Sequence, residues 1–423
     1  MFDRIRKILT DSPNSLEMTD KDWNDFTRGT NMNKLSRKQF LYSSAALLTV
    51  PTFLEQCASS PYPRLAGKLG IDPLENSDAE NFPDPILKAI NVGITAPNPH
   101  NSQAWKFKIL SALEMELYVD ETRILPVTDP TTRQIHIGQG TFLELLKIGA
   151  NQLGYNPEIK ILPKGDYAFS QIGKKPVASV QLTKRKEAFH PLYSAVKIRA
   201  TNRAVYEGDL ITEAEIQKIR ELGNPTSSQL FSILDFPTID SVQKILFESM
   251  KVESTTFRTN DESRIWFRFS DSEIQSKRDG IALPDQGVTG FTRWMAESFF
   301  MGPEVEKFHD PRGIDIFLGR YKKALESSKA IVYWKTNTNT KKDWILSGMD
   351  YARFHLAVTN LGLKMHPCSQ PLQEFPEMEA LRKQLEKTLN VRGSEKVQMI
   401  ARLGRSTYQY FTPRRSLKNM IVS

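Results

Sequence analysis

The sequence contains two kinds of segment that each occur twice, in the same order. The first kind is a polar loop followed by a strand pattern, found at residues 97–110 and, more faintly, at residues 223–234. The second kind is an amphipathic helix pattern that stops shortly after Leu-Gly, found at residues 140–155 and 348–363. Because the order is the same in both halves, the pattern favours an internal repeat over coincidence.

The stretch between strand and helix is longer in the second half, which predicts an insertion at about residues 247–335. This stretch is rich in aromatic and charged residues, and Gly280, Gly287, Gly290 and Gly302 stand in it among polar loops. It can serve either as a lid over a site or as an extra helical layer. Elsewhere helix and strand patterns alternate, so the expected fold class is α+β. A length of 423 residues suits two domains or a fused pair of halves.

The distribution of charged residues and cysteines argues against several classes of function. The formal net charge is +8, but 57 basic residues are scattered among 49 acidic ones, which indicates a solvated surface and no nucleic-acid partner. The two cysteines, Cys57 and Cys368, stand in unlike contexts and predict no disulfide framework. The six histidines form no metal-ligand spacing, so we expect no metal site.

The N-terminal part has the pattern of an export leader. After Met32, where translation could begin, come Lys34, Arg37 and Lys38, followed by an apolar run over residues 42–54 that is too short to span a bilayer. We expect residues 1–57 to form an N-terminal extension and leader, with Cys57 as an unmodified cysteine near the cleavage point.

The motif Ser-Arg-Lys-x-Phe-Leu at residues 36–41 resembles the twin-arginine (Tat) export signal, with Lys38 where the second arginine normally stands. The expected location is therefore outside the bacterial cytoplasm, periplasmic or membrane-associated, with membrane contact only through the leader. If the leader does not function, the protein is cytoplasmic.

Three motifs downstream resemble the nitroreductase-like FMN-binding family. Residues 96–105 are similar to its Asn- and Gln-bearing loop, with Ala104 in place of the usual proline. Residues 199–206 resemble its opening arginine segment, and residues 400–404 followed by 413–417 resemble its closing strand and basic tail. The resemblance extends over roughly residues 80 to 420, without the insertion.

Within this family the sequence is most similar to the exported, internally duplicated (Acg-like) branch. Residues 351–353, 366–367 and 369–374 fit that branch. The resemblance implies a nitroreductase-like fold in which one chain imitates the family homodimer. The first half would span residues 80–190 and the second half residues 191–423.

The resemblance also implies one FMN site built from both halves. The first half would supply Asn98, Pro99, His100, Asn101 and Gln103 from its polar loop. The second half would supply Arg199, Thr201, Arg203, Arg414 and Arg415.

Each of these residues has an expected role and a simpler alternative. Arg199 would bind the phosphate as a bidentate donor with help from Thr201, and Arg414 or Arg415 would complete the clamp. Arg203 would lie near the pyrimidine end of the ring and raise its reduction potential. The alternative for each arginine is an ordinary surface charge.

The loop residues carry the same kind of alternative. Asn101 and Gln103 offer amides to the polar edge of the ring, or they simply complete a hydrogen-bonded turn. We interpret His100 as a turn residue, expect no catalytic side chain, and expect Trp105 in the core at the start of a strand.

A complementary second site is not expected. Residues 76–90 contain no arginine, and the second loop has Thr226 and Ser227 where His100 and Asn101 stand in the first. The sequence therefore predicts one flavin per chain.

The leading hypothesis is an FMN-dependent oxidoreductase that takes electrons from a nicotinamide, NAD(P)H, or another donor and passes them to a nitroaromatic or a quinone. Because the sequence has no GxGxxG dinucleotide fold, a nicotinamide would have to visit the flavin site itself. The alternative is a protein that stores or sequesters FMN with little turnover, as expected if the insertion closes over the ring. If the chain binds no FMN, a structural or interaction role on a degenerate scaffold would follow.

Overall fold

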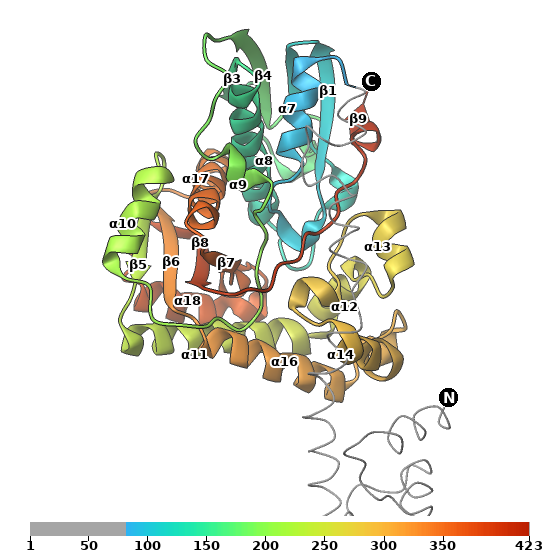
Figure 1. Cartoon of the computed structure of the whole chain (residues 1–423). Coiled ribbons are helices and arrows are strands. Elements are labelled where there is room, and N and C mark those ends of the chain that lie inside the picture. The colour runs from blue at the N-terminus through green and yellow to red at the C-terminus, as the bar shows by residue number, and fades with distance from the viewer. Residues whose placement is uncertain (1–81, 423) are drawn as a thin grey trace, which may run out of the picture. The chain divides into compact units, whose positions relative to one another are not determined.

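The computed structural model describes residues 82–422 (Figure 1). The expected leader, residues 1–57 with Cys57, lies outside these residues, and so does the segment 76–81 that precedes the first helix. Among the described residues, no helix combines the length and the apolar character that a membrane span requires.

The first half consists of a sheet with helices beside it. Its helices are α7 (Pro85–Gly93), α8 (Arg133–Gln152) and the short α9 (Tyr193–Val196). Its strands are β1 (Trp105–Ser111), β2 (Glu114–Val119), β3 (Tyr155–Ile161) and β4 (Ala178–Lys184). The sheet order is β3-β4-β2-β1-β9, antiparallel except for β9 (Ile421–Val422), which runs parallel to β1.

The second half has a four-stranded antiparallel sheet. Its helices α10 (Glu213–Leu222), α17 (Lys341–Asn360) and α18 (Glu379–Thr388) accompany strands β5 (Gln229–Ile233), β6 (Ala330–Thr336), β7 (Lys364–Pro367) and β8 (Lys396–Gly404). The sheet order is β5-β6-β8-β7, and every residue of β6 is buried. The chain after β8 then returns to the first sheet, where it ends as β9 (Figure 1).

A helical segment separates β5 from β6. It contains α11 (Phe236–Thr255), α12 (Phe257–Trp266), α13 (Asp271–Lys277), α14 (Gly290–Met295), α15 (Val305–Phe308) and α16 (Pro311–Glu326). In the other sheet, by contrast, β1 and β2 are joined by a tight turn. Residues 330–335, expected at the end of the insertion, belong to β6 and hence to the sheet.

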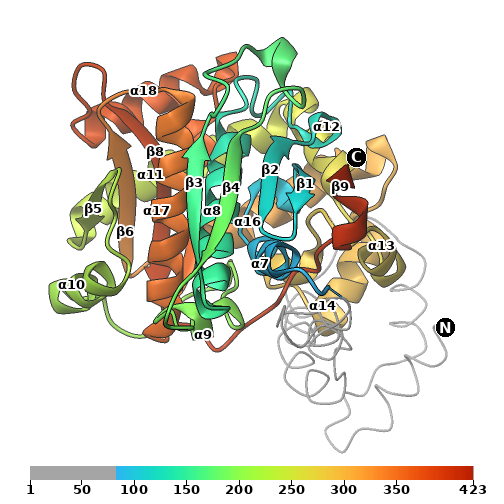
Figure 2. The ribbon, with the colours of Figure 1, turned by 90° about the horizontal axis from the view of Figure 1, so that it is seen from above.

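Helices α8 and α17 pack against each other side by side (Figure 2). Gly140 and Gly348 lie at their crossing, where a Cβ on Gly140 would stand 1.9 Å from the carbonyl oxygen of Ile345. A Cβ on Gly348 would stand 2.0 Å from the carbonyl oxygen of Ile137. Glycine is therefore required at both positions, because any side chain would push the helices apart.

Both helices begin about two turns earlier than the sequence pattern indicated. The expected helix 140–155 is α8, and Tyr155 already belongs to β3. The expected helix 348–363 is α17, which starts after a capping box formed by Thr340 and Asp343. One core cluster extends across both halves and includes Trp105, buried at the start of β1 as expected.

Candidate functional site

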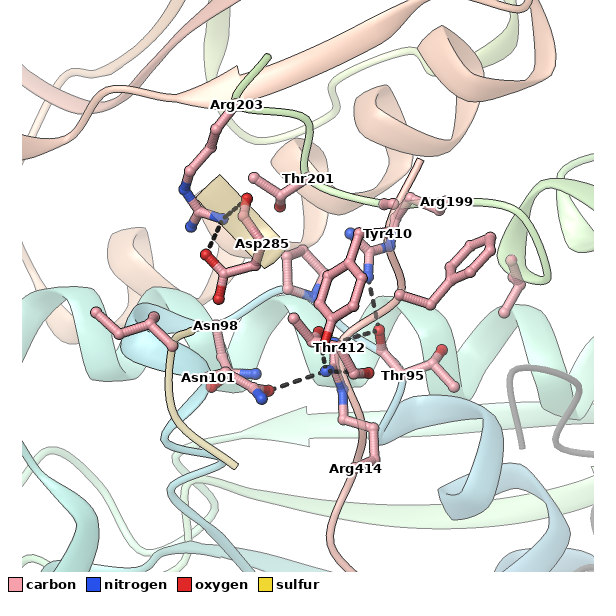
Figure 3. Close-up of a pocket in the computed structure, with 15 residues that line it drawn as sticks. Thr95, Asn98, Asn101, Arg199, Thr201, Arg203, Asp285, Tyr410, Thr412 and Arg414 are labelled. Carbon is pink, nitrogen blue, oxygen red and sulfur yellow. Dashed lines mark hydrogen bonds and ion pairs between the residues drawn. The ribbon is translucent and has the colours of Figure 1, made fainter. Parts of the chain in front are cut away.

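A pocket of about 810 Å³, with open solvent at its mouth included, lies where four segments meet (Figure 3). These segments are the loop after α7, the end of α9 with the residues that follow it, the helical insertion, and the C-terminal tail. The lining residues are Thr95, Pro97, Asn98, Asn101, Val196, Arg199, Ala200, Thr201, Arg203, Ile281, Asp285, Tyr410, Phe411, Thr412 and Arg414. Six of the ten residues that the sequence singled out are among them.

The loop is shaped by residues with a left-handed backbone. His100, Asn101 and Gln103 have φ of 50°, 49° and 52°, a region that asparagine and histidine adopt more readily than glutamine. The Oδ1 atom of Asn98 accepts a hydrogen bond from the amide of Gln103 at 2.8 Å, which closes the loop on itself. The loop therefore presents Asn98 and Asn101 to the pocket.

Gln103 holds this loop instead of lining the pocket. Its side chain is fully buried, donates to the carbonyl of Arg278 at 2.9 Å, and accepts from the amide of Arg415 at 2.8 Å. Pro99, His100 and Arg415 are also absent from the lining. Contact of these four residues with a cofactor stays a prediction, and within the protein Gln103 and Arg415 join the loop to the tail.

His100 belongs to the same loop, and its side chain is neutral. Its Nε2 lies 3.4 Å from the hydroxyl of Ser263, and burial, together with the charge of Arg203, lowers its pKa to about 4. At neutral pH the imidazole is therefore uncharged.

The arginine segment is fixed against the edge of the second sheet. Thr201 forms a parallel bridge with Met365 of β7, and the amide of Asn202 donates to the carbonyl of Met365 at 3.0 Å. Arg402 of β8 donates to the carbonyl of Ala204 at 2.8 Å. These contacts direct Arg199, Thr201 and Arg203 into the pocket.

Two guanidinium groups, Arg199 buried and Arg414 partly buried, share one end of the pocket. Arg199 and Arg414 both donate to the carbonyl oxygen of Thr95, at 2.8 and 3.2 Å (Figure 3). Arg414 also donates to Asn101 Oδ1 at 2.9 Å and to the carbonyl of Ile94 at 2.8 Å. Thus the tail, the loop and the end of α7 are joined by a single side chain.

Neither of these two cations has a carboxylate partner within the described chain. The Nε atom of Arg199 is buried and makes no hydrogen bond in this part of the protein. Burial and the nearby charge of Arg199 lower the pKa of Arg414 to about 9, and burial lowers the pKa of Arg199 to about 10. Both groups therefore carry their charges at neutral pH, without a counter-ion.

At the other end of the pocket the charge is balanced. Arg203 Nη1 lies 3.3 Å from Asp285 Oδ1, and the side chain of Asp285 is only 4% exposed. Asp285 also accepts a hydrogen bond from the amide of Ala282 at 2.8 Å. Burial raises the pKa of Asp285, and the positive charge of Arg203 opposes that rise. Asp285 comes from the insertion, and no sequence motif pointed to it.

Between the two ends, the wall is largely apolar and aromatic. Tyr410, Phe411, Val196, Ala200, Ile281 and Pro97 form it. Tyr410 is 8% exposed, and burial raises its pKa well above the usual value. A flat, mostly apolar group that carries an anion at one end would match this arrangement.

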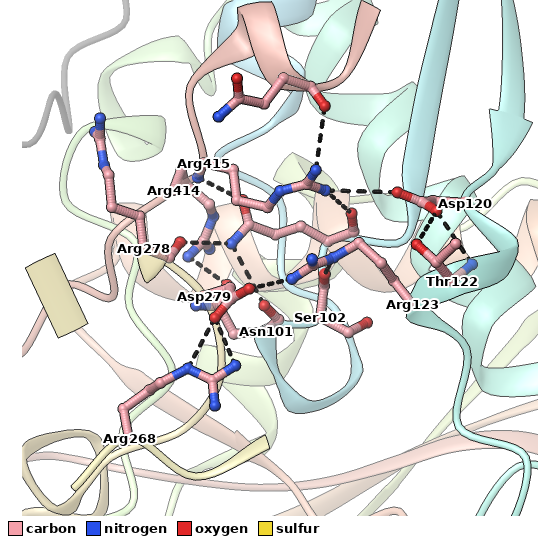
Figure 4. A network of polar contacts seen from close by, with 12 residues as sticks. Asn101, Ser102, Asp120, Thr122, Arg123, Arg268, Arg278, Asp279, Arg414 and Arg415 are labelled. Atoms are coloured by element: carbon pink, nitrogen blue, oxygen red, sulfur yellow. Dashed lines mark hydrogen bonds and ion pairs between the residues drawn. The ribbon is translucent and has the colours of Figure 1, made fainter. Parts of the chain in front are cut away.

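The insertion is tied to the loop by a network of polar contacts (Figure 4). Asp279 accepts hydrogen bonds from Arg123 of the first half and from Arg268 of the insertion, the latter at 2.6 and 2.8 Å. The amide of Gly280 donates to the carbonyl of Asn101 at 3.2 Å. These contacts hold Ile281 and Asp285 at the pocket.

The polar loop before β5, which the sequence pattern compares with the loop at Asn98, binds a carboxylate of the protein itself. The amides of Thr226, Ser227 and Ser228 donate to the carboxylate of Asp350 at 2.8 to 2.9 Å. Asp350 is fully buried and also pairs with Arg353 at 3.3 Å. The donors of this loop are therefore already satisfied. In the described residues there is also no His, Cys, Asp and Glu group suited to a metal ion.

Comparison with known proteins gives low similarities. No protein-family model matches the chain, and no curated protein matches it in sequence. Among solved structures, it is similar to the FMN-dependent nitroreductase NfnB from Mycobacterium smegmatis in complex with NADPH, with 15% identity and a TM-score of 0.35, over 53% of this chain and 94% of the other. It is also similar to the FMN and NADPH-dependent nitroreductase NfnB from Sphigopyxis sp. strain HMH, with 13% identity and a TM-score of 0.36, over 55% and 99%.

A nitroreductase with bound FMN from Bacteroides fragilis is similar at 14% identity and a TM-score of 0.29, over 52% of this chain and 90% of the other. Each of these matches therefore involves about half of the present chain and nearly all of the smaller protein. At this level of similarity, the function has to be inferred from the pocket itself.

Proposed function

We propose that the pocket binds FMN and that the protein is an FMN-dependent oxidoreductase of the nitroreductase type. The observation that carries this proposal is the pair of guanidinium groups, Arg199 buried and Arg414 partly buried, without a carboxylate partner in the described chain. Burying a charge is costly unless an opposite charge compensates it, and here two like charges lie side by side. An anionic ligand would supply the missing compensation.

The donors at this end suit a phosphate monoester. Such a group carries about −1.5 to −2 charges near pH 7 and three acceptor oxygens, so it can engage two arginines together. Arg199 has a buried Nε without a partner, and Thr201 adds a hydroxyl to the same lining. The residues present therefore fit the phosphate end of FMN.

The rest of the lining suits a tricyclic ring. The apolar and aromatic wall can cover its faces. The side-chain amides of Asn98 and Asn101 already form hydrogen bonds within the protein, so they shape the wall of the pocket. The resemblance implies a cation beside the pyrimidine end, and Arg203, which lines the pocket, is the residue we propose for it. Bound FMN would supply the two-electron chemistry, and the chain would supply binding, orientation and charge.

We further propose that the chain imitates a homodimer and holds one flavin. The strand orders β3-β4-β2-β1 and β7-β8-β6-β5 correspond element by element, and α8 and α17 cross at paired glycines. This correspondence supports two related halves. Asp350 already fills the donors of the second loop, which supports a single occupied site.

The electron donor we propose is NAD(P)H or another hydride donor, and the acceptor a nitroaromatic or a quinone. The donor and the acceptor would use the same pocket in turn, because the sequence contains no separate dinucleotide-binding motif.

The test starts with the purified full chain loaded with FMN. We expect a yellow protein that bleaches on addition of NADPH without oxygen and regains its colour when a nitroaromatic or a quinone is added. A protein that binds FMN but keeps its colour under NADPH would favour storage of the flavin over turnover. A chain that cannot be loaded with FMN would contradict both functions.

A further inference from the structure

We infer that Asp285 of the insertion holds down the reduction potential of the bound flavin by pairing with Arg203, an inference that rests on the proposed function. The observation behind this inference is an ion pair in the wall of the pocket. Arg203 Nη1 and Asp285 Oδ1 lie 3.3 Å apart, and both residues line the pocket (Figure 3).

The charge balance of the pocket gives the reason. A lone cation beside the ring would stabilise the negative charge that the ring gains on reduction, and would raise its potential. A buried carboxylate at 3.3 Å from that cation cancels most of this effect, because the two opposite charges act on the ring from nearly the same place. The ring would therefore feel Arg203 and Asp285 as a dipole and not as a full positive charge.

The insertion fixes this carboxylate in position. Asp285 accepts from the amide of Ala282, and Arg268 and Arg123 both hold Asp279 a few residues earlier. Other ionisable groups around Asp285 are Tyr408 and Tyr410, whose pKa values it helps to raise, and Arg293, whose charge acts on both tyrosines. Among these groups, Arg203 is the cation for which the structure gives an ion pair with Asp285.

The pairing of Arg203 with Asp285 would change how readily the reduced flavin gives up electrons. With Arg203 neutralised, reduced FMN gives up its two electrons more readily to acceptors of low potential, such as nitroaromatics. Asp285 would then be a positioning residue that acts on the flavin through Arg203, and the insertion would set the range of acceptors.

The experiment measures the midpoint potential of bound FMN in five proteins at one pH. We expect Asp285→Asn to shift the potential to more positive values, with reduced FMN bound at least tenfold more tightly relative to oxidised FMN, or about 30 mV for a two-electron couple. Arg203→Gln should shift the potential in the opposite direction. The double variant should return towards the wild-type value, because it removes both charges. Asp261→Asn, which removes a carboxylate paired with Arg264 outside the pocket lining, is the matched control and should not shift it.

The outcomes separate this inference from the proposed function. If the wild-type chain binds no FMN, the proposed function fails and the inference fails with it. If the wild type binds FMN and Asp285→Asn leaves the potential unchanged or lowers it, only the inference is overturned. Circular dichroism shows whether Asp285→Asn and the double variant fold. If both fold but no longer bind FMN, then Asp285 is needed for FMN binding and does not set the reduction potential, which also overturns the inference.

Discussion

Arg199 and Arg414 donate hydrogen bonds to one and the same carbonyl oxygen, although more than half of the chain separates them in sequence. This shared acceptor, Thr95 O, brings two positive charges to the same end of the pocket. The repulsion between them contributes to the lowered pKa of Arg414. In the FMN-free protein this repulsion is unfavourable, and a bound anion would offset it.

The first prediction concerns the repulsion between Arg199 and Arg414. Inorganic phosphate should raise the thermal midpoint of the FMN-free protein, with a stabilisation of about 2.7 kcal/mol when its concentration is a hundredfold above the dissociation constant. Sodium chloride at equal ionic strength should have a smaller effect, because buried charges are poorly screened by salt. If phosphate stabilises Arg199→Ala as much as the wild type, the anion does not bind between these two arginines.

The second prediction concerns the structural role of Arg414. Its guanidinium donates to Asn101 and to carbonyls at the end of α7 and in the tail, so Arg414→Ala should lower the free energy of unfolding by more than about 3 kcal/mol. Urea denaturation of the FMN-free protein measures this loss. Arg392→Ala, at an exposed position, is the control and should stay within about 0.5 kcal/mol of the wild type. Equal stability of the two variants would show that the Arg414 contacts do not fix the tail.

The third prediction concerns the crossing of α8 and α17. Gly140→Ala places a Cβ against the carbonyl of Ile345, so the helices must separate and stability should fall by about 3 kcal/mol or more. Gly319→Ala in α16 is the matched control, because a Cβ there meets no atom within 4 Å and should stabilise the helix by about 0.4–1 kcal/mol. Tolerance of Gly140→Ala would contradict the close crossing.

The fourth prediction concerns pH. Burial raises the pKa of Glu253 in α11 from its usual value of 4.5 to about 7, so the folded protein keeps a proton that the unfolded chain releases. Its contribution to stability is fully present below pH 4.5 and is lost as the pH rises through 7. Between pH 5 and pH 8, Glu253→Gln should therefore gain up to about 3 kcal/mol of stability relative to the wild type.

Urea denaturation at the two pH values checks this gain. Glu248→Gln, at an exposed position of the same helix, should give the same difference between the two pH values as the wild type. A Glu253→Gln protein whose stability follows the wild type at both pH values would show that Glu253 is ionised in the folded state.

The sequence predicted the elements that depend on local pattern. The two strands after the polar loops and the two amphipathic helices are present, because apolar spacing determines which face is buried. The starts of the helices were predicted too late. In α17 the start is marked in the sequence by the capping box of Thr340 and Asp343. In α8 the first amides are capped by Asp129, whose carboxylate accepts from Gln134 and Ile135.

Only part of the pocket lining could be predicted from the sequence, and the reason is physical. Arg199, Arg203 and Asn101 belong to motifs with a fixed local spacing, and they line the pocket together. Asp285 and Tyr410 come from the insertion and the tail, where the chain path decides which side chain reaches the site. Gln103 was expected at the ligand, but as a buried amide it needs partners, and it finds them in the backbone of Arg278 and Arg415.

The most direct test of the central claim compares the affinity of the FMN-free chain for FMN with its affinity for riboflavin, which has the same ring and no phosphate. We expect FMN to bind more tightly by several kcal/mol, and Arg199→Ala to weaken FMN binding by about 1.5–3 kcal/mol while riboflavin binding stays nearly the same. Equal affinities for FMN and riboflavin in the wild type, or an Arg199→Ala protein that binds FMN as well as the wild type does, would contradict a phosphate site at Arg199 and Arg414.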